Sequence, residues 1–268
     1  MTMIKLYPNK NPITKIVLPD EVVYLDNAMF LKENTTTSLT LSKNLKYISS
    51  VEGWGGKEKN LGFYHLTEVL IPDENPNYTS VDGILYTKDM KMLQWYPDNA
   101  PIKAFNIPEL VTTIEPMQLM NTANLVELNI PANLSIYNVL YAISESLSFM
   151  NKIIGFRCPK LEKITVDINN KELEAVDGVL YSKGVTKLLL YPSGKKDKKF
   201  IVPNTVSAIN SKSYNPYLEE IALSKNKYWT FEYTHNELIK NPFLYFTALK
   251  KFSIPSDSEY YKVKDGVL

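Results

Sequence analysis

The feature that most constrains this chain is an internal repeat. Residues 81–86 read Val-Asp-Gly-Ile-Leu-Tyr, and residues 176–181 repeat the motif as Val-Asp-Gly-Val-Leu-Tyr 95 positions later. A third copy, Asp-Gly-Val-Leu, lies at residues 265–268. The pairs ending in Pro19, Pro108 and Pro203 keep nearly the same period, with spacings of 89 and 95. Because independent anchors share one period, the sequence predicts an array of similar modules and not one or two ordinary globular domains.

A shorter pattern, apolar-x-x-apolar-x-apolar, occurs nine times. Its last two apolar positions alternate at period 2, which is the spacing of a half-buried strand. A proline, which cannot donate a main-chain hydrogen bond, directly follows six of the copies. The pattern predicts one short strand per coil, stacked into a parallel sheet, because no coil buries its apolar face without its neighbours. The nine copies begin at residues 13, 36, 66, 102, 125, 161, 197, 218 and 249.

The Asp-Gly segments have a different pattern. Residues 179–182 and 186–192 are two apolar runs on either side of Lys183-Gly184-Val185, and residues 84–97 repeat this arrangement. Two apolar runs across a short turn predict a β-hairpin, so we expect one projecting hairpin per module. Helix is expected only in two inserts, near residues 138–150 and 234–241.

Both ends of the chain match parts of a hairpin. Residues 3–8 align with residues 92–97, the second strand of the first hairpin, and residues 267–268 begin another first strand. We therefore expect a single array over residues 1–268, with modules of about 13–101, 102–196 and 197–268 and residues 1–12 as the tail of a preceding hairpin. The hypothesis is that the chain is an excerpt of a longer array; the alternative is that natural ends fall there. Unpaired end strands would allow head-to-tail self-association.

Composition excludes several classes of function. Hydrophobic residues make up 44% of the chain, which argues against wholesale disorder. The 30 basic and 29 acidic residues leave a net charge of +1, and Arg157 is the one arginine, so no nucleic acid partner is expected. One cysteine and two histidines exclude a disulfide framework and a thiolate metal cluster. No run of 18 apolar residues predicts a membrane span, and the start lacks the pattern of a signal peptide.

The few residues capable of chemistry have two interpretations each. Cys158 could be a nucleophile, but no histidine lies near it in sequence, so a small buried residue bonding the next coil is favoured. His65 and His235 fall in different modules without a spaced acidic partner, which favours surface or packing roles. We predict no catalytic residue, no metal ligand and no cofactor.

The charged clusters likewise have two interpretations each. Glu219-Glu220, Asp73-Glu74 and the pair of Glu172 with Glu174 could suggest a glycosidase, which needs two carboxylates across one cleft. Neighbouring residues of a strand point to opposite faces, so solvated surface is favoured. The basic run at residues 195–199 could bind an acidic partner, but solvation of the link between hairpin and coil is favoured.

Aromatic residues fall into two groups. Five tyrosines recur at equivalent hairpin positions, which favours packing roles: Tyr7, Tyr86, Tyr96, Tyr181 and Tyr191. Four others lie in irregular inserts where repetition does not explain them: Trp54, Tyr228, Trp229 and Tyr233. Exposed aromatic side chains anchor protein or sugar ligands, so these inserts are the first candidates for binding, although the ligand-binding residues stay unknown.

Taken together, these motifs resemble the BspA-like (Treponema pallidum-type) leucine-rich repeats. The likeness rests on residues 176–182, 188–195, 201–206 and 218–221, and on the aromatic-x-Cys turn at residues 156–161. The resemblance implies an α/β, strand-dominated leucine-rich-repeat solenoid: a right-handed superhelix with a parallel β-sheet face, projecting hairpins and few short helices. It also implies a bacterial cell-surface or secreted, extracellular protein that serves in adhesion. We therefore expect a non-enzymatic module that binds host or neighbouring-cell proteins, with a structural spacer or a carbohydrate-binding or carbohydrate-active domain, engaging a glycan, as alternatives.

Overall fold

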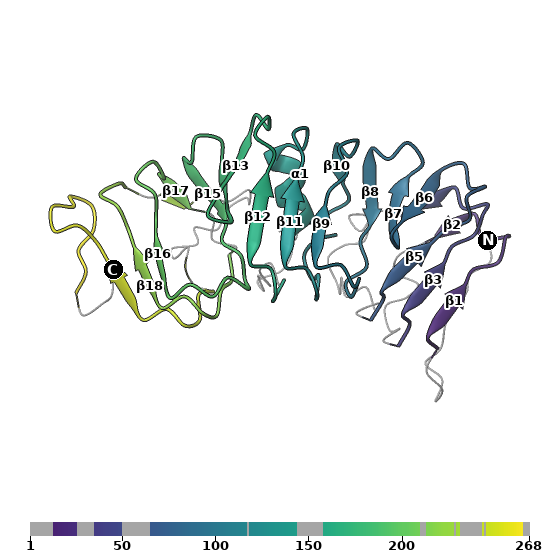
Figure 1. Cartoon of the computed structure of the whole chain (residues 1–268), viewed down its shortest axis with the longest axis horizontal. Coiled ribbons are helices and arrows are strands. Elements are labelled where there is room, and N and C mark those ends of the chain that lie inside the picture. Colours follow the sequence, from purple (N-terminus) through teal and green to yellow (C-terminus); the bar gives the residue numbers. More distant parts are fainter. Residues whose placement is uncertain are drawn as a thin grey trace.

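In the computed structural model the chain forms an elongated array of short strands (Figure 1). The structure describes residues 13–25, 35–49, 65–116, 118–143, 158–209, 213–227, 229–230, 243 and 245–264. Each of the nine predicted repeat strands is present. They are β1 (Lys15–Val17), β3 (Ser38–Thr40), β5 (Glu68–Leu70), β9 (Ala104–Asn106), β11 (Glu127–Ile130), β12 (Lys163–Val166), β16 (Lys199–Ile201), β18 (Glu220–Ala222) and β20 (Lys251–Ser253).

These strands do not form the single parallel sheet that the sequence predicted. They form three separate parallel sheets in the orders β1-β3-β5, β9-β11-β12 and β16-β18-β20, one in each module. The strands within each sheet lie in register, so Leu39 is flanked by Ile16 and Val69, and Ile221 occupies the same central place in the third sheet. These central side chains are buried, and most of the residues on either side of them are partly or fully exposed. The apolar pattern therefore sets the register of each coil on the next.

Each of the first two modules ends in an antiparallel unit of three strands, one more than the predicted hairpin. The units are β6 (Tyr78–Val81), β7 (Ile84–Thr87) and β8 (Met92–Trp95), and β13 (Leu173–Val176), β14 (Val179–Ser182) and β15 (Lys187–Leu190). The predicted hairpins are β7–β8 and β14–β15. The extra strands β6 and β13 arise because Asp82-Gly83, with φ of 51° and 77°, is itself a two-residue hairpin turn. Asp-Gly is preferred in such turns because both central residues need positive φ.

The Asp-Gly turn also covers the outer edge of each of the first two parallel sheets. The carbonyl of Gly83 accepts a hydrogen bond of 2.8 Å from the N–H of Val69 in β5, and Gly178 accepts one of 2.9 Å from Ile164 in β12. The turn thus occupies part of the edge on which a fourth strand would pair. A Cβ at Gly83 would lie 2.8 Å from the Cβ of Glu68, so glycine is required for this close approach.

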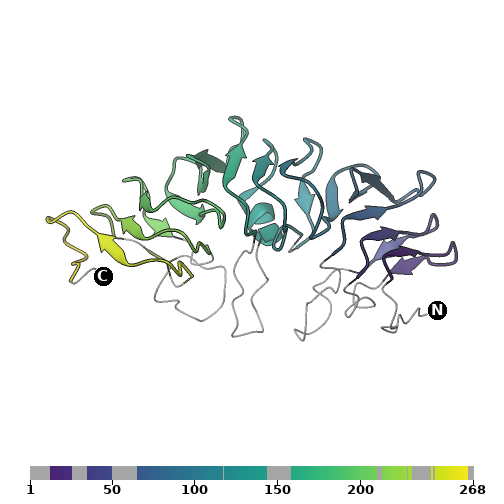
Figure 2. The same ribbon diagram turned by 60° about the horizontal axis from the view of Figure 1, so that its bottom comes forward.

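A second row of strands runs beside the first (Figures 1 and 2). In this row β2 (Tyr24–Leu25) pairs with β4 (Tyr47–Ile48), β8 pairs with β10 (Thr113–Ile114), and β15 continues through β17 (Ala208–Ile209) to β19 (Trp229–Thr230), all in parallel. The helix expected near 138–150 is α1 (Ile136–Ile143), which begins two residues earlier. Residues 144–150 and the second expected helix, at 234–241, lie outside the described residues.

Three buried asparagines join successive coils. The Nδ2 of Asn170 donates to the carbonyls of Pro131 and Leu134, at 2.9 Å each, in the preceding coil. Its Oδ1 accepts from the backbone N–H groups of Glu172 and Leu173, at 3.0 and 2.8 Å. One side chain therefore satisfies four backbone groups that the short coils leave without strand partners. Asn75 and Asn215 make equivalent contacts in their own coils.

The predicted packing role of the hairpin tyrosines is confirmed for Tyr86, Tyr96, Tyr181 and Tyr191, which are all at most 2% exposed. Tyr7 lies outside the described residues. Tyr96 and Tyr191, which directly follow the last strands of the two hairpin units, differ in one respect. The hydroxyl of Tyr191 donates to a carboxylate oxygen of Asp197 at 3.2 Å, whereas the buried hydroxyl of Tyr96 has no partner among the described residues.

This difference predicts opposite responses to the same substitution. Tyr191→Phe should lower the free energy of unfolding by about 1 kcal/mol, because it removes a hydrogen bond to a charged group. Tyr96→Phe should leave stability unchanged or raise it by up to about 1 kcal/mol, because it removes a buried hydroxyl without a partner. Urea unfolding of both variants checks this, and equal losses in the two would contradict it.

Candidate functional site

Cys158 is a buried structural residue. Its Sγ lies 2.7 Å from the hydroxyl of Thr122 and donates to the carbonyl of Leu119 at 3.1 Å. Both partners belong to the preceding coil, so the expectation of a contact with the next coil is wrong in direction. Burial raises the pKa of the thiol to about 12, which leaves almost no thiolate at neutral pH. The thiol therefore links two successive coils, as the side chains of Asn170 and Asn215 do in other parts of the array.

Thiol labelling provides a direct check of this burial. We expect Cys158 to react with a water-soluble disulfide reagent only as fast as the protein unfolds, because the thiol is fully buried and protonated. The measurement is the labelling rate in native buffer, with protein in guanidinium as the fully reactive control. Complete labelling of the native protein within seconds would contradict the structure.

Glu220 is the first residue of β18, and Glu219 directly precedes it. Both carboxylates form ion pairs with lysines. Glu219 pairs with Lys198 and Lys250 at 2.8 and 2.9 Å, and Glu220 pairs with Lys199 at 2.9 Å and with Lys251 at 3.7 Å. Hydrogen bonds from Lys198 and Lys250 lower the pKa of Glu219 to about 2. A general acid needs a raised pKa, so this pair is not suited to glycosidase chemistry. The two rows connect the three strands of the third sheet across its surface.

The remaining acidic and histidine candidates have structural or solvent-exposed positions. Asp73, Glu74 and His65 are exposed, and His235 lies outside the described residues. Glu172 accepts from the backbone N–H of Ile136 at 2.8 Å, at the start of α1, and Glu174 accepts from the N–H of Gly184 at 3.0 Å. Among the residues that the structure describes, no cluster of three or more His, Cys, Asp or Glu side chains could hold a metal ion.

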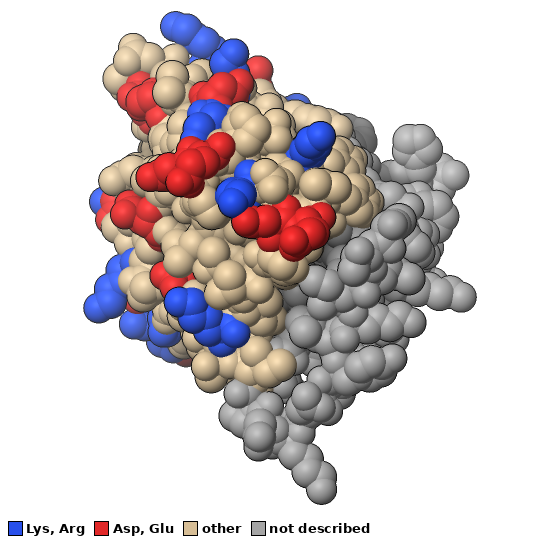
Figure 3. Space-filling view, turned by 90° about the vertical axis from the view of Figure 1, so that its right-hand side faces the viewer, with Lys and Arg blue, Asp and Glu red and all other residues tan. Residues whose placement is uncertain are grey.

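The basic run at residues 195–199 is electrically compensated. Lys195 pairs with Asp197 at 3.1 Å, and Lys196 pairs with Glu162 at 3.0 Å. The other two lysines of the run are those paired with Glu219 and Glu220. The run therefore does more than solvate the link, because its four charges are matched by carboxylates from three coils. At the N-terminal end of the array, acidic and basic side chains are likewise interspersed (Figure 3).

An exposed aromatic pair was missed by the sequence analysis. Tyr24 and Tyr47 are opposite each other on β2 and β4, with ring centroids 5.5 Å apart and ring planes 19° from parallel. They are 39% and 53% exposed. Trp229 lies at the place on β19 that corresponds to Tyr47, opposite Ala208, so the spacing of two modules between Tyr47 and Trp229 was the available signal. Of the other candidates, Trp54, Tyr228 and Tyr233 lie outside the described residues.

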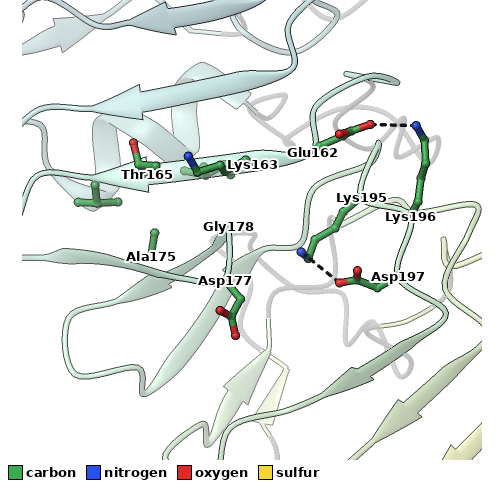
Figure 4. A pocket seen from close by; sticks show the side chains of 11 residues that line it. Glu162, Lys163, Thr165, Ala175, Asp177, Gly178, Lys195, Lys196 and Asp197 are labelled. Carbon is green, nitrogen blue, oxygen red and sulfur yellow. Dashed lines mark ion pairs between the residues drawn. The ribbon is translucent and has the colours of Figure 1, made fainter.

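A hollow of about 640 Å³ lies at the boundary between the second and third modules (Figure 4). One wall is β12, the opposite wall is the hairpin unit with Ala175 and Gly178, and the segment 195–197 lines the rest. The ion pairs Lys195–Asp197 and Lys196–Glu162 border this last side (Figure 4). A hollow of this size is within the range of ligand sites in proteins. We call it the joint hollow.

A second hollow, of about 480 Å³, lies across the turns of the first three coils and is lined in part by Asp20, Asn44 and Asn77.

No helix within the described parts of the chain has the length and apolar character needed to cross a membrane.

Solved structures resemble this chain over most of its length. A leucine-rich cell-surface protein from Faecalibacterium prausnitzii covers 90% of the chain at 21% identity with a TM-score of 0.50. A leucine-rich repeat protein from Eubacterium ventriosum covers 91% at 19% identity with a TM-score of 0.47, and the pneumococcal vaccine antigen PcpA covers 95% at 17% identity with a TM-score of 0.42. The chain spans 53%, 61% and 55% of the lengths of these three structures.

Sequence comparison adds no relative, since neither a family model nor a curated protein matches. The likeness to the Faecalibacterium protein agrees with the repeat strands, the parallel sheets and the near absence of helix described above. The chain therefore has the leucine-rich-repeat fold, as the resemblance of its motifs to BspA-like repeats predicted.

Proposed function

We propose that this chain is a non-enzymatic protein-binding module of a bacterial cell-surface or secreted protein, used in adhesion to host or neighbouring-cell proteins. The observation that carries the proposal is a long outer surface whose polar side chains are already held in rows. The amide of Asn129 donates to Asn106 at 2.7 Å, and Thr165 donates to Asn129. On the same strands Lys163 pairs with Glu127 at 2.9 Å. Binding a partner would immobilise few additional side chains, which lowers the entropic cost of association.

The surface location is part of the same proposal. The Faecalibacterium protein is described as a cell-surface protein, which supports the same location here. We further propose that residues 1–268 form one right-handed solenoid with modules of about 13–101, 102–196 and 197–268. A solenoid of this kind offers a long surface in place of an enclosed cleft, which suits a large or extended partner.

Binding to whole cells tests the function. The labelled chain would be incubated with epithelial or bacterial cells, untreated or treated beforehand with protease or with glycosidases. The proposal predicts saturable binding that protease treatment abolishes and glycosidase treatment leaves intact. No saturable binding would favour the spacer function, and turnover of a glycan by the chain would favour the carbohydrate-active alternative.

A glycan-binding function is the second candidate, because the exposed Tyr24–Tyr47 pair offers aromatic surface of the kind on which sugar rings stack. It predicts that glycosidase treatment removes the binding and that Tyr24→Ser with Tyr47→Ser weakens it. If binding is protein-mediated, alanine at Trp54 and Trp229 tests whether the inserts contribute.

A further inference from the structure

The exposed tyrosine pair begins a row of side chains that the third coil continues with a different residue. Tyr24 and Tyr47 each lie seven residues after a paired strand residue of the first sheet, and Asn77 lies seven residues after Leu70. The Nδ2 of Asn77 donates to the carbonyl of Leu45 at 3.0 Å, so the third coil lies against the second at this place. Asn77 therefore takes the third place in a row at the N-terminal end of the array (Figure 1).

This row leaves a place for a further ring beside Tyr47. The rings of Tyr24 and Tyr47 are stacked with their centroids 5.5 Å apart, which is close to the spacing of neighbouring strands. Tyr47 belongs to the middle coil, so one face of its ring lies against Tyr24 and the other is directed toward the third coil. Asn77 is shorter than tyrosine and has no ring. A ring supplied by a ligand can therefore continue the stack above Asn77.

The second hollow, which we call the turn hollow, begins at the same place. Asn77 lines it, together with Val23 and Lys46, which directly precede Tyr24 and Tyr47 in the chain. Its volume of about 480 Å³ is within the range of ligand sites. The described lining of the joint hollow, by contrast, contains no aromatic residue. Exposed aromatic surface and a hollow thus adjoin each other in the first module.

Polar side chains make up most of the described lining of the turn hollow: Asp20, Glu21, Asn44, Lys46 and Asn77. Two of them are already held in place, since Asn44 donates to the carbonyl of Asp20 at 2.9 Å and Asn77 donates to the second coil. A ligand that binds here would immobilise few additional groups, which lowers the entropic cost of binding.

This combination of groups favours a sugar over an aromatic side chain of a protein. An aromatic side chain would exclude water from the polar lining without replacing its hydrogen bonds, which is unfavourable. A pyranose ring has an apolar face of C–H groups that stacks on an aromatic ring, and a rim of hydroxyls that donate and accept hydrogen bonds. The described lining has two carboxylates, Asp20 and Glu21, and one lysine, Lys46, so it has no excess of positive charge to attract an acidic sugar.

We propose that the first module binds a short neutral glycan, with one pyranose ring stacked on Tyr47 above Asn77 and the next sugar residue in the turn hollow. Hydroxyls of the second sugar donate to the carboxylates of Asp20 and Glu21 and accept from Lys46. This inference goes beyond the proposed protein-binding function, because it adds a separate site for a ligand of another class.

One variant should fill the site without disturbing the fold. Asn77→Tyr adds a third ring to the stack, and the carbonyl of Leu45 keeps its hydrogen bond from Asn75 at 2.9 Å. The labelled wild-type chain would be screened on an array of neutral, amino and acidic glycans, and the affinity of the best ligand would be measured by calorimetry. We expect a neutral glycan to bind, Asn77→Tyr to weaken it at least about tenfold, and Tyr47→Ala to weaken it about fivefold to tenfold.

Thr113→Tyr is the matched control. Thr113 corresponds to Tyr24 after the 89-residue shift and is exposed, so this variant adds a tyrosine to the same row in the second module. It should leave the affinity for the glycan unchanged. Thermal unfolding and circular dichroism would confirm that all three variants fold. The proposal is overturned if no neutral glycan binds, or if the best one binds Asn77→Tyr or Tyr47→Ala as tightly as it binds the wild-type chain.

The cell-binding assay separates this inference from the proposed function. If the array identifies no glycan but Asn77→Tyr abolishes protease-sensitive cell binding, the row holds an aromatic side chain of a protein and the glycan site is wrong. If Asn77→Tyr abolishes glycan binding and leaves protease-sensitive cell binding intact, the two sites are separate, as proposed. Loss of the protease-sensitive binding alone contradicts only the proposed function.

Discussion

Replacing Asn170 with alanine should lower the free energy of unfolding by about 3–4 kcal/mol, a large share of the stability of an ordinary domain. The side chain is 1% exposed and bonds four backbone groups from two coils. Alanine leaves two carbonyls and two N–H groups without these partners in a site closed to bulk water. Denaturant unfolding followed by circular dichroism measures the loss.

A matched surface variant separates this effect from a general sensitivity to loss of asparagine. Asn44 also donates to a backbone carbonyl of the preceding coil, that of Asp20 at 2.9 Å, but it is exposed to water. Asn44→Ala should therefore cost less than about 1 kcal/mol. Asn170→Asp should resemble Asn170→Ala, because the carboxylate keeps the acceptor but faces two carbonyls without a donor. Equal, small losses at both asparagines would contradict the role given to Asn170.

Replacing Gly194 with alanine should cost about 3 kcal/mol or more, or prevent folding, because there is no room for a methyl group. A Cβ there would lie 2.5 Å from the carbonyl carbon of Lys160 and 2.8 Å from the backbone nitrogen of Leu161. Both atoms belong to the backbone, so neither can move without shifting β12. The N–H of Gly194 also donates to the carbonyl of Leu161 at 2.7 Å, which fixes the two segments together.

Gly184 is the control, since it combines an unfavourable conformation with open space. Its φ is +76°, and the nearest atom to an added Cβ is the Cγ2 of Thr186 at 4.0 Å. Gly184→Ala should therefore cost only the strain of the left-handed conformation, about 1–2 kcal/mol. Thermal or denaturant unfolding of both variants makes the comparison, and a larger loss at Gly184 would show that the contact at Gly194 is looser than described.

The nine repeat strands could be predicted because each depends on a local apolar pattern that every coil must satisfy. The extra strand of each hairpin unit could not, because residues 78–81 and 173–176 carry no strong alternation and their partner is identified only once Asp82-Gly83 is recognised as a turn. The division into three sheets depends on the same turn, whose carbonyl reaches the edge of β5 only in three dimensions.

The candidate site depended more on contacts between distant residues. The lysines at 195–199 looked like a basic patch because their partners Glu162, Glu219 and Glu220 lie in other coils. The role of Asn170 was missed because nothing local distinguishes a buried asparagine from a turn residue. The difference between Ser80 and Ala175, by contrast, is visible when the modules are aligned, but its meaning requires the direction of the N–H groups of Ile71 and Val166.

The two module boundaries differ in one main-chain contact: the hydroxyl of Ser80 accepts from the N–H of Ile71 at the first, whereas Ala175 has no hydroxyl to offer Val166 at the second. Amide hydrogen exchange of the free chain, measured residue by residue by NMR, tests this most directly. The account predicts slow exchange at Ile71, Val69 and Ile164, whose N–H groups are bonded, and exchange at Val166 faster by at least about tenfold. Equal protection of Val166 and Ile71 would contradict it.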